Sequence, residues 1–280
     1  MAPEEEPDGF GAEPLDVTER QLRSWIIEDT DDAVVLSKPG WVVCHPSKRG
    51  PFSSLVGAAR EVLGLERVHL VSRLDRETSG LVILARHRAM ASRLQTALSQ
   101  RRVQKRYTAI VHGRMESRVE VSQAIGPDVD SEVVVKQCVN SQVDSQKAQT
   151  SFIPLKFKGD YTLVEVVPHT GRKHQIRVHA QWLGHPISGD KLYGPDPLLY
   201  LDFVTNGWTE KHEQALPIKR QALHAGDLVF ETPEGDFHWS APLPPDMVEL
   251  WESIKGDESR PPARSGSRRR RQPPEQKSDL

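Results

Sequence analysis

The sequence contains little cysteine and no long apolar run, and both absences exclude classes of protein. Cys44 and Cys138 are the only cysteines in 280 residues, too few for a disulfide framework, and they lack the spacing of a zinc site. No run of 18 apolar residues occurs, so we expect no membrane-spanning helix. The N-terminal MAPEEEPDGF has no apolar segment of the kind that a secretory signal needs. Together these absences predict a protein of the reducing cytoplasm.

The net charge is also small, and taken alone it argues against a nucleic-acid partner. The formal net charge of −2 comes from 37 basic and 39 acidic residues. However, residues 1–32 hold 11 acidic and 2 basic residues, residues 33–255 hold 24 and 28, and residues 256–280 hold 4 and 7. The small total therefore hides a basic body, and it does not exclude an anionic partner.

The basic residues of the body are concentrated in one stretch, from Thr78 to Met115. A solvated helix face usually mixes charges of both signs, whereas this stretch contains no Asp or Glu. The pattern predicts a surface for a polyanion; a basic face with no binding role is the alternative. The eight cations are Arg86, Arg88, Arg93, Arg101, Arg102, Lys105, Arg106 and Arg114.

Composition divides the chain into three parts. Residues 1–32 are acidic and begin with a segment rich in Glu, Pro and Gly, which predicts a mostly disordered leader. Residues 256–280 are rich in Pro and Arg and predict a disordered basic tail. Residues 33–255 carry the apolar residues of a core and predict one folded domain.

Within this domain the apolar pattern predicts strands and helices without regular alternation, which indicates the α+β class. Apolar residues at helical spacing predict four helices, one that starts at an N-cap Ser53 and ends at Gly64, and three near 90–98, 176–183 and 247–254. Residues 195–222 give no clear pattern. Predicted strands cover 33–37, 68–71, 81–85, 107–112, 133–139, 150–155 and 163–167, with a late hairpin of 223–231 and 236–240.

The segment Ser72–Leu81 is the first candidate for chemistry. Asp75 lies in it between Arg73 and Arg76, and Thr-Ser-Gly follows. Opposite charge keeps a carboxylate ionised, and the small residues can turn tightly and donate hydrogen bonds. Asp75 is therefore a candidate catalytic carboxylate. A turn that carries a surface ion pair is the alternative.

The second candidate is the segment Pro168–His179, which follows a predicted strand and opens a helix. A turn at Gly171 would bring helix N-terminal amides, Arg172 and Lys173 together where an anion could bind. The histidines of this segment invite a metal site, but positions 174 and 179 lie about 140° apart around a helix. No HExxH motif or Cys/His set completes such a site, so we predict no metal.

The third candidate is Lys105-Arg106-Tyr107, at the start of a strand. A tyrosine beside two cations can stack on a nucleobase while its phosphate is neutralised. A tyrosine in a sheet core is the ordinary alternative.

In combination, the three segments resemble the signatures of the RluA-type pseudouridine synthase family, over roughly Ala33 to Asp246. The matching segments are Arg73-Leu74-Asp75-x-x-Thr78-Ser79-Gly80, Lys105-x-Tyr107-x-Ala109-x-Val111-x-Gly113, and Thr170-Gly171-Arg172-x-His174-Gln175-Ile176-Arg177-x-His179 with Gly189-Asp190-x-x-Tyr193-Gly194. The resemblance implies that Asp75 is the catalytic aspartate, that Tyr107 stacks on the target base, that Ile176 lines the pocket and that Arg177 pairs with Asp75. Further candidates for RNA contact are Arg73, Lys105, Arg106, Arg172 and Lys173.

The resemblance also implies a fold and an activity. The fold is a single α+β catalytic domain with a mixed, mostly antiparallel central sheet flanked by helices. The activity is isomerisation of specific uridines to pseudouridine in ribosomal or transfer RNA, by a monomer and without metal or other cofactor. Whether the aspartate acts on the sugar or on the base stays open.

Two departures from the family pattern concern loop shape. Ser72 stands where the family often has His, and the early Lys-Pro-Gly segment has Trp41 where Gly is usual and Cys44 where Val is usual. Neither departure falls on Asp75. The main alternative is an RNA-binding or ribosome-assembly protein without turnover. A metal-dependent hydrolase built on the histidines is the weaker one.

Overall fold

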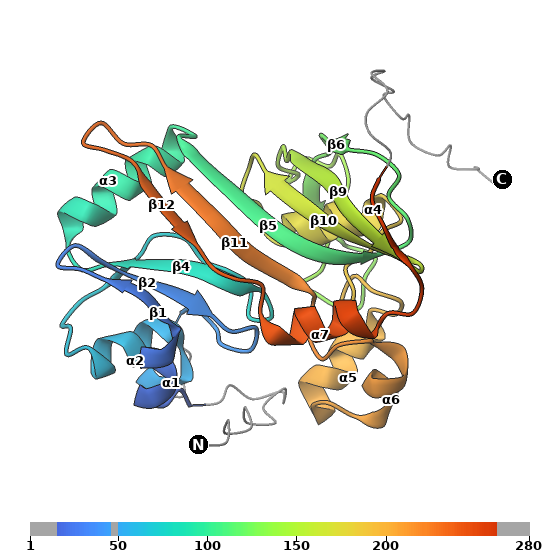
Figure 1. The fold of residues 1–280 in the computed structure, drawn as a ribbon, viewed down its shortest axis with the longest axis horizontal. Helices are drawn as coiled ribbons and strands as arrows, with labels where there is room; N and C mark the ends of the chain where they lie inside the picture. The colour runs from blue at the N-terminus through green and yellow to red at the C-terminus, as the bar shows by residue number, and fades with distance from the viewer. Residues whose placement is uncertain (1–15, 46–49, 262–280) are drawn as a thin grey trace.

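One long mixed sheet organises the chain in the computed structural model, which describes residues 16–45 and 50–261 (Figure 1). Its strands are β1 (Ile26–Asp29), β2 (Ala33–Lys38), β3 (His69–Leu70), β4 (Ser79–Ala85), β5 (Val103–His112), β6 (Val119–Val121), β9 (Thr150–Lys158), β10 (Tyr161–Pro168), β11 (Leu223–Phe230), β12 (Phe237–Ser240) and β13 (Glu258–Ser259). A separate two-stranded sheet pairs β7 (Ile125–Pro127) with β8 (Gln137–Val139).

The strand order is β1-β2-β4-β11-β5-β10-β9-β13, with β3 beside β4, β12 beside β11 and β6 beside β9. Only β4 and β11 run parallel among the described pairs, and the rest are antiparallel. Together with the flanking helices, this confirms the predicted α+β class with a mostly antiparallel sheet.

Helices cover both faces of the sheet. They are α1 (Glu19–Trp25), α2 (Leu55–Val62), α3 (Arg88–Ser99), α4 (Gln175–Trp182), α5 (Leu198–Asn206), α6 (Glu210–Ala215) and α7 (Pro245–Ser253), with a short 3₁₀ turn η1 (Pro51–Ser53). Among the described residues, no helix is long and apolar enough to cross a bilayer.

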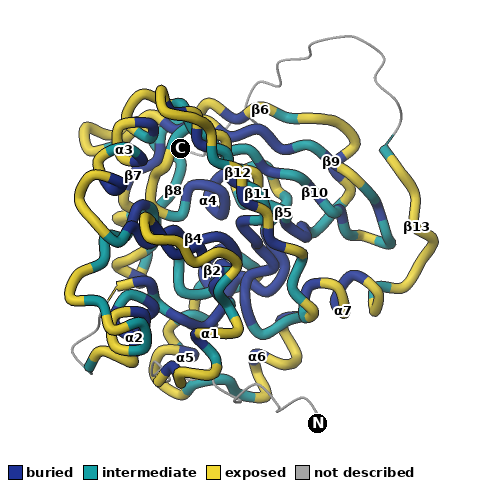
Figure 2. The backbone as a smooth tube through the Cα atoms, turned by 60° about the vertical axis from the view of Figure 1, so that its left-hand side comes forward, coloured by how far each residue is buried: buried dark blue, intermediate teal, exposed yellow. Residues whose placement is uncertain are grey.

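Strands β2 and β4 consist almost entirely of buried residues (Figure 2). Their side chains alternate between two cores. Val34 and Val82 point to one core, which α1 and α2 cover, whereas Val35 and Ile83 point to another, which α3 covers. Figure 1 shows α3 on the opposite side of these strands from α1 and α2. Because helices pack against both faces of β2 and β4, the loop that enters β4 has a fixed position.

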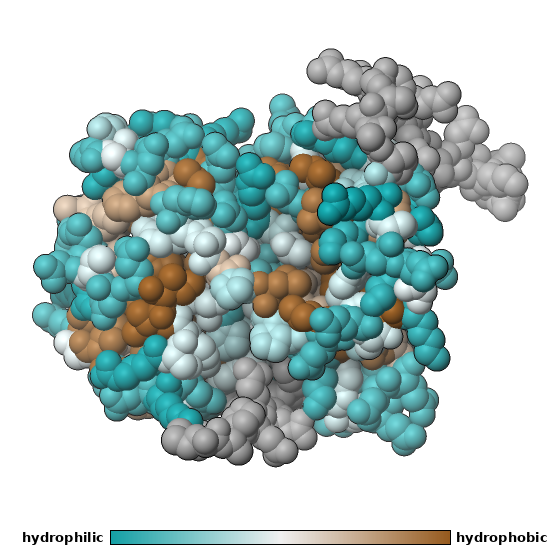
Figure 3. All heavy atoms as spheres, viewed as in Figure 1, coloured by the Kyte–Doolittle hydropathy of each residue, from teal (hydrophilic) through white to brown (hydrophobic). Residues whose placement is uncertain are grey.

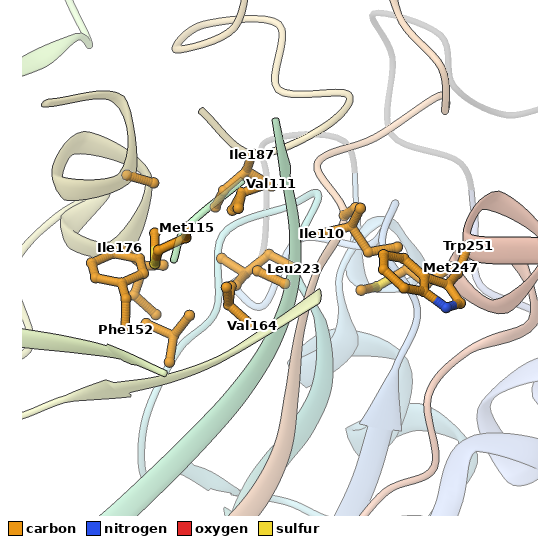
Figure 4. Packing of buried hydrophobic residues seen from close by; sticks show 14 of the residues in the cluster. Ile110, Val111, Met115, Phe152, Val164, Ile176, Ile187, Leu223, Met247 and Trp251 are labelled. Atoms are coloured by element: carbon orange, nitrogen blue, oxygen red, sulfur yellow. The ribbon is translucent and has the colours of Figure 1, made fainter. Parts of the chain in front are cut away.

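A third core lies between β5, β9 and β10 and the helices α4 and α7. Ile176 packs in it near Phe152 and Met115, while Ile110 lies closer to Met247 at the other end (Figure 4). The first turn of α4 is therefore anchored in the core.

On the face shown in Figure 3, hydrophilic residues predominate, and hydrophobic ones show as separate patches.

The acidic leader predicted for residues 1–32 is partly wrong, because residues 16–32 are folded. Thr18 and Gln21 form a capping box that starts α1, and the apolar Leu22 of that helix is fully buried. Apolar residues between the acidic ones supply enough burial to order the segment. Residues 1–15 lie outside the described residues, and so does the tail from 262 onward; β13 pairs with β9 just before it.

Two local predictions need correction, and one unassigned segment is now defined. The N-cap of α2 is Ser54, whose side chain accepts from the amide of Gly57, while Ser53 ends the 3₁₀ turn η1. Of the strand predicted at 133–139, only 137–139 forms a strand. The unassigned segment 195–222 contains α5 and α6. The other predicted strands and helices are present, with ends shifted by a few residues.

Candidate active site

Asp75 lies in the loop 71–78 between β3 and β4, which other elements hold in place. The Lys38 ammonium donates to the carbonyl of Arg76 at 2.9 Å, the Gln221 amide donates to the Thr78 hydroxyl at 2.5 Å, and the Lys191 ammonium donates to the Glu77 carboxylate at 2.9 Å. These bonds come from β2 and from the segments after α4 and α6. We call residues 71–78 the Asp75 loop.

The turn out of this loop requires a glycine. Gly80 has φ +114°, a conformation that residues with a side chain rarely adopt, and a Cβ there would lie 2.3 Å from the carbonyl oxygen of Ala225. The clash would separate β4 from β11, which run parallel. Gly80 therefore lets the two strands approach directly behind Asp75.

The two unusual residues of the early segment contact the same loop. The Cys44 thiol lies 3.4 Å from the amide nitrogen and 3.5 Å from the carbonyl oxygen of Leu74. The ring of Trp41 packs edge-on against Trp25 of α1 at 5.6 Å, and its carbonyl accepts from Arg76 at 3.2 Å. Both substitutions are thus accommodated by direct contacts.

Arg177 on α4 faces two carboxylates. One of its terminal nitrogens donates to Asp75 Oδ2 at 3.0 Å, while Nε and the other terminal nitrogen donate to the two oxygens of Asp190 at 2.7 and 2.9 Å. Asp190 is fully buried and also accepts from the amides of Leu192 and Tyr193. The structure therefore places the guanidinium in a fixed, bidentate clamp that points one nitrogen at Asp75.

The charges of this cluster keep Asp75 ionised. Burial alone would raise the pKa of Asp75, but the charge of Arg177 and its hydrogen bond outweigh burial and hold that pKa below its ordinary value. The same balance lowers the pKa of Asp190. Asp75 is thus a carboxylate at neutral pH although it is half-buried.

His174 is a residue of the site that the sequence analysis left without a role. It begins α4 in the left-handed region at φ +56°, where its Nδ1 lies 2.8 Å from the Tyr193 hydroxyl. That hydroxyl accepts from the amide of Gln137 at 2.9 Å, so its own hydrogen is directed to Nδ1. Burial and the charge of Arg177 lower the pKa of His174 to about 4. The ring is therefore neutral, with a hydrogen on Nε2, 3.9 Å from Asp75 Oδ2.

All nine predicted site residues line one groove of about 1090 Å³. Tyr107 lies on β5 within it, and burial together with the charge of Asp75 raises the pKa of its phenol, so the ring stays neutral. Ile176 is buried and contributes an apolar wall. The nine are Arg73, Asp75, Lys105, Arg106, Tyr107, Arg172, Lys173, Ile176 and Arg177.

The basic stretch 78–115 does not form a single surface for an anionic partner. This corrects the prediction that the whole stretch is a polyanion-binding surface. Acids from distant segments pair with several of its cations: Asp29 with Arg86, Glu234 with Arg93 at 3.0 Å and Glu165 with Arg106 at 3.3 Å, while the neighbouring Glu116 pairs with Arg114 at 3.7 Å. Of the eight cations of this stretch, only Arg101, Lys105 and Arg106 line the groove. The other groove cations come from residues 73, 118, 172, 173 and 177.

Comparison with known proteins places this geometry in a family. The family model described as RNA pseudouridylate synthase matches residues 32–182. The chain belongs to this family. An uncharacterized RNA pseudouridine synthase of Bacillus subtilis, YjbO, is 37% identical over 83% of this chain and 76% of its own length. The ribosomal large subunit pseudouridine synthase D of Vibrio vulnificus is 34% identical over 83% of this chain and 71% of its own length.

Solved structures agree with the sequence comparison. Human RNA pseudouridylate synthase domain containing 1 aligns with a TM-score of 0.65 at 27% identity, over 83% of this chain and 88% of that one. Human RNA pseudouridylate synthase domain containing 4 aligns with a TM-score of 0.66 at 27% identity, over 84% of this chain and 94% of that one. The protein is thus an RNA pseudouridine synthase of the RluA type, an isomerase.

Two histidines of the segment 168–179 are used in hydrogen bonds within the synthase. His179 bonds the Thr150 hydroxyl at 2.9 Å and the Gln123 carbonyl at 3.1 Å, and the Nδ1 of His174 is engaged by Tyr193. Within residues 16–45 and 50–261, no group of three or more His, Cys, Asp or Glu side chains could hold a metal ion.

Proposed function

We propose that Asp75 is the catalytic carboxylate of this synthase and that the groove binds the RNA strand carrying the target uridine. The arrangement that supports this most is the Arg177 guanidinium between Asp75 and the buried Asp190, in one groove with Tyr107. A protein that only binds RNA does not need an ionised carboxylate among its RNA-facing cations, because the carboxylate would repel phosphate. The arrangement therefore favours turnover over the non-catalytic alternative.

The reaction requires no group from outside the chain. The C1′–N1 bond of uridine breaks, the uracil turns, and a C1′–C5 bond forms, while C5 loses a proton and N1 gains one. Atoms and electrons balance without an oxidant or reductant. The chain must therefore supply an ionised group near the sugar and base, and a place that keeps the detached uracil from diffusing away.

The residues of the groove can supply both. Extracting the base from its stack costs a few kcal/mol, and stacking on Tyr107 returns about 1–3 kcal/mol. Ile176 provides an apolar wall that excludes water beside the base. Asp75 acts on the sugar or on the base. Arg177 keeps the Asp75 carboxylate ionised and fixes its orientation. Arg73, Lys105, Arg106, Arg172 and Lys173 contact the RNA backbone.

His174 and Asp190 act through other residues in this proposal. Asp190 positions Arg177 through two hydrogen bonds, and the neutral His174 directs an N–H toward Asp75. Both keep the Asp75 carboxylate in one orientation, and neither adds a second positive charge beside it. They are positioning residues, whereas Asp75 and Tyr107 touch the substrate.

We further propose that the substrate is structured ribosomal or transfer RNA, with ribosomal RNA favoured by the name of the Vibrio relative. We expect the enzyme to act as a monomer in the cytoplasm. Mapping pseudouridines in total RNA from cells with and without the gene tests the substrate. We expect one or a few sites to disappear on deletion and to return when purified enzyme is added to the deficient RNA. A map that does not change would contradict the proposal.

A further inference from the structure

A second cavity, of about 350 Å³, adjoins the groove at Asp75, and we call it the side cavity. Its volume falls within the range of pockets that bind small organic groups, about 300–1,000 Å³. Helix α5 forms one wall of it, in the segment 195–222 that had no predicted structure. Six residues line both spaces: Arg73, Leu74, Asp75, Lys173, His174 and Arg177. A strand that places a uridine at Asp75 therefore passes the mouth of the side cavity.

The cations shared by the two spaces differ in how they are used. Arg177 is engaged by Asp75 and Asp190, as described above. Arg73 and Lys173 are exposed, and neither forms an ion pair or a side-chain hydrogen bond with any residue in the part of the chain that the structure describes. Two uncompensated cations at a shared boundary are suited to a phosphodiester that crosses it.

The wall on α5 offers one aromatic ring for stacking. Tyr200 is half-buried and lines the side cavity, and burial raises the pKa of its phenol, so it is neutral. Phe203 lines the cavity too, but the Lys191 ammonium already lies over its ring, at 4.4 Å. Val204, one turn along from Tyr200, is exposed and apolar. A planar base could therefore lie against Tyr200 and Val204.

The side cavity also contains a buried acceptor without a donor. Gln221 is 1% exposed and lines the cavity; its amide nitrogen donates to Thr78, but its Oε1 has no partner among the described residues. Buried polar atoms are seldom left unpaired in proteins. An N–H on the edge of a nucleobase is the kind of donor that would satisfy it.

We propose that the side cavity binds the base of a nucleotide adjacent to the target uridine. The base stacks on Tyr200, Gln221 accepts from its N–H, and the linking phosphate lies between Arg73 and Lys173. This inference rests on the proposed function, because the groove must hold the target uridine for its neighbour to reach the cavity. It assigns a role in substrate selection to α5.

The test uses the full-length enzyme and a synthetic RNA hairpin that carries the mapped uridine. Three versions are compared: the natural sequence, one with an abasic nucleotide on the 5′ side of the uridine, and one with an abasic nucleotide on the 3′ side. Base stacking of this kind contributes about 1–3 kcal/mol. We therefore expect kcat/KM to fall by roughly tenfold or more for one of the two abasic RNAs.

The enzyme variant Tyr200→Ala localises the effect. With the natural hairpin it should lose as much kcat/KM as the abasic change causes, and with the abasic hairpin it should lose little more, because the same contact is already absent. Leu201→Ala, on the same helix but outside the cavity, is the matched control and should behave as the wild type.

Two results would overturn the inference. Full activity on both abasic hairpins would show that no neighbouring base is bound. Additive losses from Tyr200→Ala and the abasic change would show that the base binds elsewhere. Because the abasic change leaves the protein intact, poor folding of a variant cannot mimic the first result. The proposed function fails separately, if wild-type enzyme converts no uridine in the natural hairpin.

Discussion

Arg177 bonds two carboxylates of different exposure, and it donates more hydrogen bonds to one than to the other. Asp190 is fully buried and takes two hydrogen bonds from the guanidinium, while Asp75 is half-buried and takes one. Asp190 therefore fixes the guanidinium, and Asp75 stays accessible to a substrate. A buried charge whose partner is removed is costly, so the two roles can be separated by mutation.

We expect Asp190→Asn to destabilise the fold and to reduce turnover without abolishing RNA binding. Loss of the buried charge leaves Arg177 poorly compensated, at a cost on the order of 3 kcal/mol. Asp190 normally opposes ionisation of Asp75, so the pKa of Asp75 should fall further in the variant. Chemical denaturation measures the first effect, and the acidic limb of the kcat profile, moved to lower pH, measures the second. An unchanged free energy of unfolding would show that the clamp has no structural role.

Tyr107 permits a distinction between stacking and proton transfer. Its phenol pKa is raised by burial and by Asp75, so the group is a neutral ring at any pH at which the enzyme is assayed. Tyr107→Phe should keep KM for RNA close to that of the wild type, whereas Tyr107→Ala should lose about 1–3 kcal/mol of base stacking. Steady-state kinetics on the mapped RNA measure both. Normal turnover by Tyr107→Ala would contradict the stacking role.

At this scale, part of the site could be predicted and part could not. Asp75, Tyr107 and Arg177 stand in short motifs that carry a signal in combination, although each alone leaves an ordinary alternative open. The role of His174 depends on a left-handed backbone and on a chain of contacts from Gln137 through Tyr193, and no local pattern connects these three positions.

The Asp75 loop is the element on which the site depends, and Lys38 on β2 is one of its supports. The Lys38 ammonium is fully buried and donates to the carbonyls of Pro39, Val42 and Arg76 at 2.7, 2.9 and 2.9 Å. Burial lowers its pKa from 10.5 to about 7, against a smaller opposing effect of Cys44. Protonation of Lys38 and folding are therefore linked.

The sign of this linkage gives a prediction. Between pH 7 and 10.5 the unfolded chain binds a proton that the folded chain releases, so stability should rise with pH in this window. From pH 7 to 9 the wild type should gain on the order of 2 kcal/mol relative to Lys38→Met, which lacks the titrating group. Denaturant titrations at both pH values measure the difference. Lys211→Met on α6, an exposed lysine, is the control and should match the wild type; a wild-type advantage over Lys38→Met that stays constant with pH would refute the linkage.

Elements with strong periodicity were predictable, and those that depend on tertiary context were not. Strands β2 and β4 contain continuous apolar runs, with two β-branched residues each, and are buried on both faces. The segment 133–139 has similar residues, but Val134 is 92% exposed and only its last part pairs, with β7. Composition misled at α1, because a few apolar residues among acidic ones are sufficient to order a capped helix on a sheet.

For the whole molecule, charge must be read from the fold and not from the sequence alone. Cations that follow one another in the chain are separated by pairing with distant acids, and cations from several segments converge on the groove. The sequence predicted an anionic partner correctly but placed much of the surface wrongly.

Salt dependence separates the two kinds of cation. Arg172→Gln should weaken RNA binding and reduce the slope of log K against log salt concentration by about one. Arg93→Gln should leave that slope unchanged, since Arg93 pairs with Glu234 and lies 4.6 Å from the Phe237 ring centre. Equilibrium binding to the mapped RNA over a salt series measures both. Equal effects of the two substitutions would contradict the assignment of the groove as the RNA surface.

The most direct test of the central claim is the yield of pseudouridine from Asp75→Asn, which preserves side-chain shape and removes the charge. Asp31→Asn, at an exposed loop position, is the matched control and should retain full activity. RNA from gene-deficient cells is incubated with each purified enzyme, and pseudouridine and RNA affinity are measured together. We predict no detectable pseudouridine from Asp75→Asn and little change in affinity. Pseudouridine formed by Asp75→Asn at a rate near that of the wild type would contradict the account.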